Sequence, residues 1–197
     1  PALIYTNADL AKSLLGYRYR TLDEARDRAR VLGHEKGALY PWRTINGQEA
    51  STYFPLGTAQ YHINADIAYA FKLYLDVTGD MEFLKDQAAE VLVETARVWA
   101  DVGCFAESRG GKYCICAVTG PDEYNAIVDT ISIRISWRGR ISAMPGGRLT
   151  HFAQWMRPPW EALVAKLGVK EEERALWNRI VENMYFPYDE GRKVYPL

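Results

Sequence analysis

Two consecutive segments with the apolar periodicity of helices, in the middle of the chain, constrain its fold more than any other feature. Apolar side chains recur every three or four residues from about Tyr61 to Val77, which is typical of an amphipathic helix. Gly79 is placed to end this helix, and Asp80 is placed to cap the next one. So short a connection predicts an antiparallel helix pair. The second helix has a broad apolar stripe that includes Trp99 as a core residue: Phe83, Leu84, Ala88, Val91, Leu92, Thr95, Val98 and Trp99.

Shorter segments flank this pair and complete a mainly α prediction with one β-hairpin. Asn7 is placed to cap a helix that runs to about Leu15. Thr21 and Glu24 form a capping-box pattern, which predicts a helix that ends at Gly33. The other expected elements are a hairpin with its turn at Arg109–Lys112 and a strand at Tyr113–Val118, and helices near Leu149–Trp155 and at Lys170–Met184.

Composition excludes several classes of protein. The chain of 197 residues is 48% hydrophobic, which is enough for one buried core. A net charge of −1 gives no electrostatic reason to expect nucleic acid or an anionic membrane as partner. No apolar run approaches membrane-spanning length. The three cysteines include one lone Cys-x-Cys, which is no metal signature, so we expect free thiols in a reducing cytoplasm and no metal.

The run Cys116–Asn125 contains an acidic pair in a stiff turn. Gly120 permits a tight bend and Pro121 fixes its own φ. A carboxylic acid partly shielded by Tyr124 can keep its proton near neutral pH and donate it to a leaving oxygen. The alternative for any such acidic turn is a solvated loop with no chemistry.

Several separate motifs resemble, in the same order, the catalytic domain of glycoside hydrolase family 65, which contains maltose, kojibiose, nigerose and trehalose phosphorylases. The resemblance runs from about residue 1 to 129 and resumes near 163. It implies a partial (α/α)6 barrel, or helical toroid, with the hairpin near the catalytic loop, and it implies that residues 1–197 are a central fragment of one catalytic domain. The motifs are Gly37–Gly47, Gly57–Tyr69, Thr78–Asp80, Glu94–Ala100 and the acidic turn.

The resemblance implies an inverting α-glucosyl disaccharide phosphorylase in which Glu123 is the general acid. Inorganic phosphate, as co-substrate, attacks the opposite face of the sugar and yields β-glucose 1-phosphate. A second catalytic carboxylate is then unnecessary, unlike in an inverting hydrolase, and no cofactor is expected. Two alternatives stay open: a trehalose-type α-glucoside hydrolase, and a non-catalytic helical module that binds sugar or a partner.

The same resemblance places further residues at the sugar site, each with a plainer alternative. Trp42 could pack on a sugar face. His62 could contact the acceptor sugar or phosphate, or be structural. Glu49 lies in a loop that influences which disaccharide is accepted, or is a solvated charge. The remaining candidates lie beside Glu123 and could instead shape the turn: Asp122, Tyr124 and Asn125.

The expected partners are a disaccharide and phosphate, in the cytoplasm. Family members are commonly dimers, so a homodimer of the full-length protein is one expectation, with the oligomeric state left open. The versions Tyr-Pro-Trp-Arg-Thr and Ala-Gln-Tyr-His-Ile-Asn lean towards the kojibiose type. We expect weak or absent activity from residues 1–197 alone.

Residues 130–148 do not fit the rest of the chain. From Thr130 to Trp160 there is no acidic residue, and five arginines occur without clean periodicity. Codons read one base out of phase can encode an amphipathic helix of the family's type. We therefore interpret 130–148 as an out-of-phase segment; if it is genuine, Arg and Ser replace a barrel helix.

Overall fold

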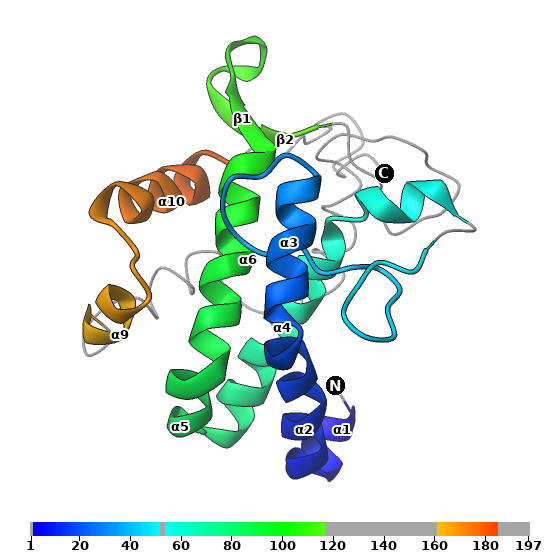
Figure 1. Ribbon diagram of the computed structural model, residues 1–197. Helices are drawn as coiled ribbons and strands as arrows, with labels where there is room; N and C mark the ends of the chain where they lie inside the picture. Colours follow the sequence, from blue (N-terminus) through cyan, green and yellow to red (C-terminus); the bar gives the residue numbers. More distant parts are fainter. Residues whose placement is uncertain (1, 52–53, 117–160, 185–197) are drawn as a thin grey trace, which may run out of the picture. The chain divides into compact units, whose positions relative to one another are not determined.

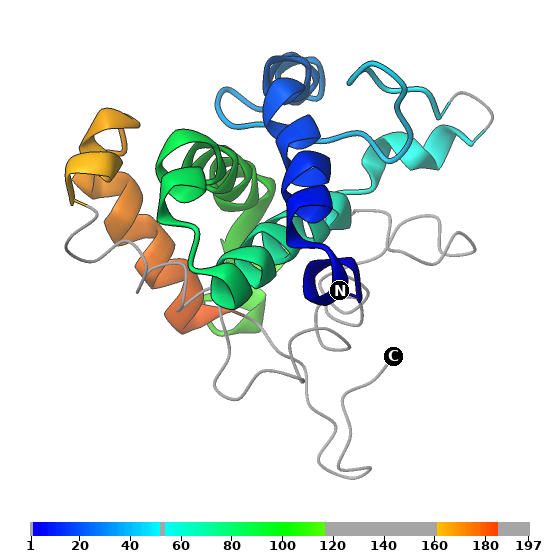
Figure 2. The same cartoon turned by 90° about the horizontal axis from the view of Figure 1, so that it is seen from below.

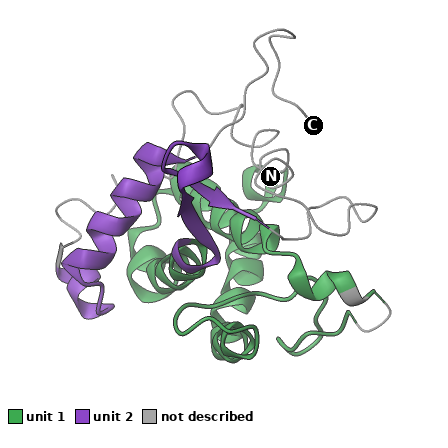
Figure 3. Cartoon of the chain, turned by 90° about the horizontal axis from the view of Figure 1, so that it is seen from above, with its two compact units in different colours: residues 1–99 green, residues 100–197 purple. Residues whose placement is uncertain are grey.

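The computed structural model describes residues 2–51, 54–116 and 161–184, and these residues are mainly helical (Figure 1). The chain divides into two compact units, residues 1–99 and 100–197 (Figure 3). The first unit holds α1 Ala2–Thr6, α2 Ala8–Arg20, α3 Leu22–Val31, the 3₁₀ turn Pro55–Ala59, α4 His62–Thr78, α5 Met81–Phe83, a π-helical turn Leu84–Ala88 and most of α6 Ala89–Val102.

Among its described residues, the second unit contains a two-stranded antiparallel sheet and two helices: β1 Gly103–Ala106, β2 Lys112–Ile115, α9 Glu161–Lys166 and α10 Glu171–Asn183. Gly103 pairs with Ile115, and Ala106 pairs with Lys112 across the hairpin. Gly110 and Gly111 both have positive φ in its turn, a conformation that glycine adopts without strain. The hairpin and α10 confirm the expected elements. The predicted helix at 149–155 and the segment 130–148 lie outside the described residues.

The antiparallel helix pair is confirmed. Gly79, in the left-handed conformation with φ of 63°, ends α4, and its N–H bonds the Leu75 carbonyl. Every residue of the predicted apolar stripe is buried, including Trp99. Phe71 of α4 stacks on Phe83 with ring centroids 5.7 Å apart. The second helix is not uniform, because the π-helical turn interrupts it and leaves both Leu84 and Ala88 buried.

Of the two N-caps predicted before residue 25, Asn7 makes its side-chain bond and Thr21 does not. The Asn7 side chain accepts a hydrogen bond from Leu10 N, as expected of an N-cap. Thr21 is the N-cap residue of α3, but its side chain makes no capping hydrogen bond. It lies directly between α2 and α3, and its hydroxyl donates to the Tyr17 carbonyl of the preceding helix at 3.0 Å. The two helices follow each other without a linker, so Thr21 has φ of −106° and ψ of 23° instead of the extended backbone of an N-cap, and its side-chain oxygen accepts from no N–H of α3.

Within the first unit, helices from distant parts of the sequence pack side by side. α1 packs on α2 and α4 (Figure 2), and α3 lies along α6. Arg26 of α3 bonds Glu90 and Glu94 of α6, at 2.6 and 3.3 Å. Beneath these ions, Ala29 and Leu39 pack against Val98 in a small apolar cluster. The pairing of α3 with α6 therefore joins two helices that lie more than 55 residues apart in sequence.

Asp80 joins α2 to the start of α5. Its Oδ1 accepts from Phe83 N at 3.0 Å, which is the predicted cap. Its Oδ2 lies 2.7 Å from Lys12 Nζ and accepts from the Tyr74 hydroxyl at 2.9 Å. The hydrogen bond from Lys12, followed by the one from Phe83 N, lowers the pKa of Asp80. One carboxylate therefore serves as helix cap and as ion-pair partner.

Two substitutions at Asp80 should separate these roles. Asp80→Ala removes cap and ion pair, and the cap alone is expected to contribute about 1 kcal/mol. Asp80→Asn keeps the cap, because asparagine is an equally good N-cap, and removes the ion pair together with the acceptor of the Tyr74 hydroxyl. A carboxyl with a lowered folded-state pKa stabilises above the unfolded pKa of about 3.9 and loses that stabilisation as pH falls through the folded pKa. Urea unfolding should therefore show an Asn deficit at pH 7 that shrinks below about pH 4; an equal deficit at both pH values contradicts this.

Among the described residues, no helix is both long and apolar enough to cross a bilayer.

Candidate functional site

The loop between α3 and α4 contains Trp42 and has little regular structure; we call it the Trp42 loop. The amide of Asn64 holds this loop to α4. Asn64 is fully buried. Its Nδ2 donates to the Ala38 carbonyl at 2.8 Å, and its Oδ1 accepts from Tyr40 N at 2.9 Å. One side chain thus satisfies a buried donor and a buried acceptor, as a neighbouring strand would. The backbone just before Trp42 is fixed to the first turn of α4 by this pair of bonds.

Arg28 of α3 fastens both ends of the same loop. Its guanidinium donates to the Tyr40 carbonyl at 3.0 Å and to the Thr58 carbonyl at 2.6 Å, and it lies 2.9 Å from Glu49 Oε2. Burial lowers the pKa of Arg28, and the charge of Glu49 opposes that effect. Oε1 of Glu49 also accepts from Ser51 N at 2.8 Å. Glu49 is therefore an anchored ion-pair partner within the loop, not a solvated charge; its predicted influence on the substrate stays a prediction.

Trp42 is half-buried and held by close neighbours. Its ring meets Phe54 edge-on with centroids 5.7 Å apart. A Cβ added at Gly57 would lie 2.8 Å from the indole, so only glycine allows this approach. The Arg43 guanidinium lies 4.6 Å from the indole centroid. A sugar packing on that face of Trp42, as the sequence predicts, would have to share it with Arg43 or displace it.

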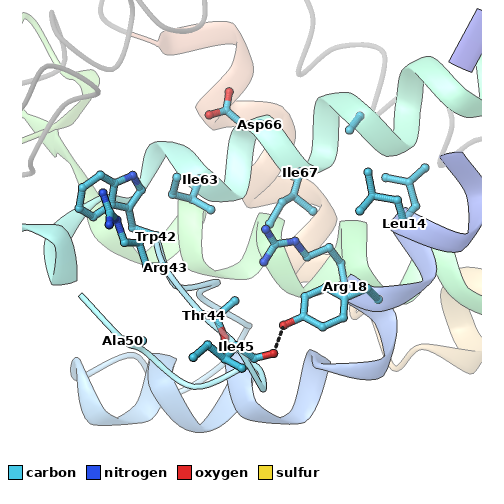
Figure 4. Close-up of a pocket in the computed structure, with 13 residues that line it drawn as sticks. Leu14, Arg18, Trp42, Arg43, Thr44, Ile45, Ala50, Ile63, Asp66 and Ile67 are labelled. Carbon is cyan, nitrogen blue, oxygen red and sulfur yellow. Dashed lines mark hydrogen bonds between the residues drawn. The ribbon is translucent and has the colours of Figure 1, made fainter. Parts of the chain in front are cut away.

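Trp42 and Arg43 lie at one side of an open pocket of about 860 Å³ between α2, α4 and the loop (Figure 4). The Tyr17 hydroxyl donates to the Ile45 carbonyl at 3.2 Å and closes the loop against α2. The size suits a small ligand with apolar and polar parts. Its apolar wall is formed by Leu14, Leu15, Ile45, Ala50, Ile63, Ile67 and Ala70, and its polar groups come from Tyr17, Arg18, Arg43, Thr44 and Asp66.

His62 is buried and is not one of the residues that line this pocket. Its Nδ1 is 3.1 Å from Asp66 Oδ2, and its Nε2 is 2.9 Å from Gln60 Oε1. Both ring nitrogens therefore have protein partners, and a sugar or phosphate would have to replace one of them. The geometry gives His62 a supporting role for Asp66, whose side chain lines the pocket. Its predicted ligand contact stays a prediction.

The predicted site residues are thus divided. Three of them lie in the Trp42 loop or at the start of α4: Trp42, Glu49 and His62. Of these three, only Trp42 lines the pocket. Glu123, Asp122, Tyr124 and Asn125 lie outside the described residues. In the part of the chain that the structure describes, no three His, Cys, Asp or Glu side chains form a candidate metal site.

Sequence reasoning missed several residues that make this pocket. Asp66 follows His62 by four positions on a predicted helix, so their pairing was available from spacing alone. Nothing local distinguishes Arg18 from the exposed Arg20 of the same helix. Asn64 and Arg28 act on backbone groups far away in sequence, which no periodicity reveals.

A helical unit with a sugar-sized pocket beside an aromatic loop is compatible with a carbohydrate-active domain, and comparisons with known proteins agree. The profile of the glycosyl hydrolase family 65 central catalytic domain matches residues 1–196. The chain belongs to this family.

Curated relatives include two α,α-trehalose phosphorylases. That of Thermoanaerobacter brockii is 46% identical over 197 residues, and that of Geobacillus stearothermophilus is 49% identical over 199 residues. Each alignment covers 100% of this chain and 25% of the relative. A kojibiose phosphorylase of Halothermothrix orenii is 34% identical, with 100% of this chain and 27% of that protein covered. The chain therefore spans about a quarter of the length of these relatives.

A solved structure supports the fold assignment. A human-microbiome protein designated a kojibiose phosphorylase matches 98% of this chain and 28% of its own, with a TM-score of 0.82 and 23% identity. At this identity the likeness concerns the fold alone. With the helices and hairpin described above, it confirms the mainly α class expected of part of an (α/α)6 barrel.

Proposed function

We propose that this chain is part of an inverting α-glucosyl disaccharide phosphorylase, with Glu123 as general acid. The observation on which this depends is the sequence Gly120-Pro121-Asp122-Glu123-Tyr124 within a chain 46–49% identical, over its whole length, to two α,α-trehalose phosphorylases. Disaccharide and phosphate are then the substrates. The trehalose phosphorylases are more similar than the kojibiose phosphorylase, so we choose trehalose as the first substrate to test, in place of the kojibiose type that the short motifs favoured.

The reaction needs one acid and one anionic nucleophile. Glu123 would donate a proton to the glycosidic oxygen as that bond breaks and the ring gains oxocarbenium character. Phosphate would attack the anomeric carbon from the opposite face, which inverts an α-glucoside to β-glucose 1-phosphate. The proton goes to the departing sugar and the phosphate oxygen forms the new bond, so no second carboxylate has to activate water.

The pocket beside Trp42 is compatible with a sugar ligand. It combines an indole, apolar surface and charged side chains of both signs, the mixture that sugar rings need for their C–H faces and hydroxyl groups. The loop that presents Trp42 is tied to the core by Asn64 and Arg28, so the indole would be pre-positioned for a ligand.

Phosphate dependence tests the proposal against the hydrolase alternative. The complete natural polypeptide that contains residues 1–197 is incubated with trehalose, then with kojibiose, with and without phosphate. Release of β-glucose 1-phosphate that requires phosphate supports the phosphorylase. Equal release of free glucose when phosphate is withheld indicates a hydrolase, and binding without turnover indicates a non-catalytic module. With residues 1–197 alone we expect weak or absent turnover.

A further inference from the structure

Asn46 and Gly47 form an Asn-Gly sequence within the Trp42 loop, and no other asparagine of the chain precedes a glycine. The Asn46 side chain is exposed. Gly47 has φ of 101°, a conformation that its lack of a Cβ permits, and an added Cβ would lie 3.0 Å from Thr21. The backbone of this pair is therefore held in place while the side-chain amide of Asn46 stays open to water.

The groups around Asn46 are those that an intramolecular acyl transfer requires. The backbone nitrogen of the next residue can attack the Cγ carbon of an asparagine to form a five-membered ring, and a glycine offers no side chain to obstruct this attack. Gln48 N donates to Asn46 Oδ1 at 3.2 Å, the atom on which negative charge develops during the attack. Asn46 Nδ2, the leaving nitrogen, lies 3.4 Å from Gln48 Oε1. These contacts orient and polarise the Asn46 amide as a target.

The hydroxyl of Thr44 opposes the same reaction. Gly47 N, the nucleophile, donates to Thr44 Oγ1 at 2.7 Å. An amide nitrogen attacks after it has lost its proton, and an acceptor bonded to the N–H stabilises the protonated form. A hydrogen bond of ordinary strength therefore lowers the rate about threefold to tenfold. The bond to Thr44 is shorter than the bond from Gln48 N, so we expect the restraint to dominate in the folded chain.

We propose that Asn46 is a site of deamidation and that the Thr44 hydroxyl sets its rate. Gly47 N forms a bond to Asn46 Cγ, the bond from Cγ to Nδ2 breaks, and ammonia leaves with the proton that Gly47 N has lost. Water then opens the succinimide ring at one of its two carbonyl carbons. The products are aspartate and isoaspartate, in which the main chain runs through Cβ and Cγ. Water enters and ammonia leaves, so the reaction needs no oxidant and no further reactant.

Either product changes the wall of the pocket. Thr44 and Ile45 line the pocket, and the Ile45 carbonyl accepts from the Tyr17 hydroxyl at 3.2 Å (Figure 4). Both products add a negative charge directly after Ile45, and isoaspartate also lengthens the main chain by a methylene group. Because Gly47 packs closely against Thr21, the longer chain has no room there. We expect isoaspartate to break the bond between Tyr17 and Ile45 and to open this side of the pocket.

Incubation of the complete natural polypeptide that contains residues 1–197, at neutral and at mildly alkaline pH, tests the proposal. Mass spectrometry of its peptides measures the fraction of Asn46 converted, and a protein isoaspartate methyltransferase labels the isoaspartate share. We expect conversion that accelerates as pH rises, because the deprotonated amide is the nucleophile. Thr44→Val should convert about threefold to tenfold faster than wild type, whereas Thr44→Ser, which keeps the acceptor, should stay within about twofold.

Two controls identify the site of conversion. Asn46→Gln keeps an amide but needs a larger ring for cyclisation, so conversion at this position should be lost. Asn7 is exposed and is followed by alanine, so it should stay unmodified and provides an internal reference in the same sample. Circular dichroism confirms the fold of each variant, and Thr44→Ala takes the place of Thr44→Val if the valine disturbs the fold.

Three results would overturn the proposal: equal conversion at Asn46 and Asn7, a rate in Thr44→Val no higher than in wild type, or no conversion in any variant. Thermal unfolding of the isoaspartate form, isolated by ion exchange, provides a second readout. It should unfold at a lower temperature than Asn46→Asp, which carries the same charge on an unaltered main chain. Equal unfolding temperatures would overturn the effect on the pocket that we assign to isoaspartate.

Discussion

Glu123→Gln is expected to lower trehalose phosphorolysis by the complete polypeptide at least about a hundredfold. The amide keeps the size of the side chain but cannot supply a proton to the glycosidic oxygen. Because the proton is needed in the transition state and not for binding, kcat should fall much more than KM rises. Initial rates of β-glucose 1-phosphate formation at saturating phosphate provide the measurement.

A good leaving group separates acid catalysis from a structural role of Glu123. α-Glucosyl fluoride needs little protonation to depart, so Glu123→Gln should impair its turnover far less than that of trehalose. Glu107→Gln, at an exposed carboxylate in the turn of the β-hairpin, is the matched control and should stay within about twofold of wild type. Equal losses on both substrates would mean that Glu123 supports the fold instead.

Asn64→Ala is expected to lower the free energy of unfolding by about 2–4 kcal/mol. The substitution leaves Tyr40 N and the Ala38 carbonyl without their side-chain partner, and both bonds are buried. Each orphaned buried group costs about 1–3 kcal/mol. Urea unfolding followed by circular dichroism measures the change, and a loss below about 0.5 kcal/mol would show that the loop has other sufficient anchors.

Two further variants sharpen this test. Asn46→Ala removes an asparagine whose bonds to Gln48 are exposed, and it should change stability by no more than about 0.5 kcal/mol. Asn64→Asp keeps the acceptor for Tyr40 N but turns a carboxylate oxygen towards the Ala38 carbonyl. Its folded-state pKa should therefore be raised, since only the protonated form can donate. Relative to wild type, Asn64→Asp should recover stability as pH falls from 7 towards 4.

The local elements were predictable because their causes are local. The boundaries of α4 follow from an apolar repeat and from Gly79, whose left-handed conformation ends the helix. Asp80 and Asn7 cap as predicted, because the bonds reach only three residues along the chain. The Thr21 side chain makes no capping bond because two helices meet there without a linker, and it is turned towards the Tyr17 carbonyl of α2 instead of towards the N–H groups of α3. A pattern search weighs each cap alone and cannot resolve such competition.

The candidate site was predictable only in part. Motif order identified the Trp42 loop and the start of α4, and it suggested a ligand contact for His62 and an influence on substrate choice for the loop of Glu49, both of which stay predictions. In the structure His62 holds Asp66 and Gln60, and Glu49 pairs with Arg28. A polar side chain in a given local sequence can face a ligand, a backbone group or a charged side chain. That choice depends on which neighbours burial brings near.

The sequence by itself determined the helix pair, its buried stripe and the family. These follow from periodicity, caps and the order of motifs, which are properties of short stretches. Only the tertiary structure decided that Asn64 would hold a backbone segment 26 residues away and that Arg18, unlike the exposed Arg20, would be half-buried with its Nη1 shielded from water. Desolvation makes the difference, because the cost of an unpaired polar group depends on the packing around it and not on its neighbours in the chain.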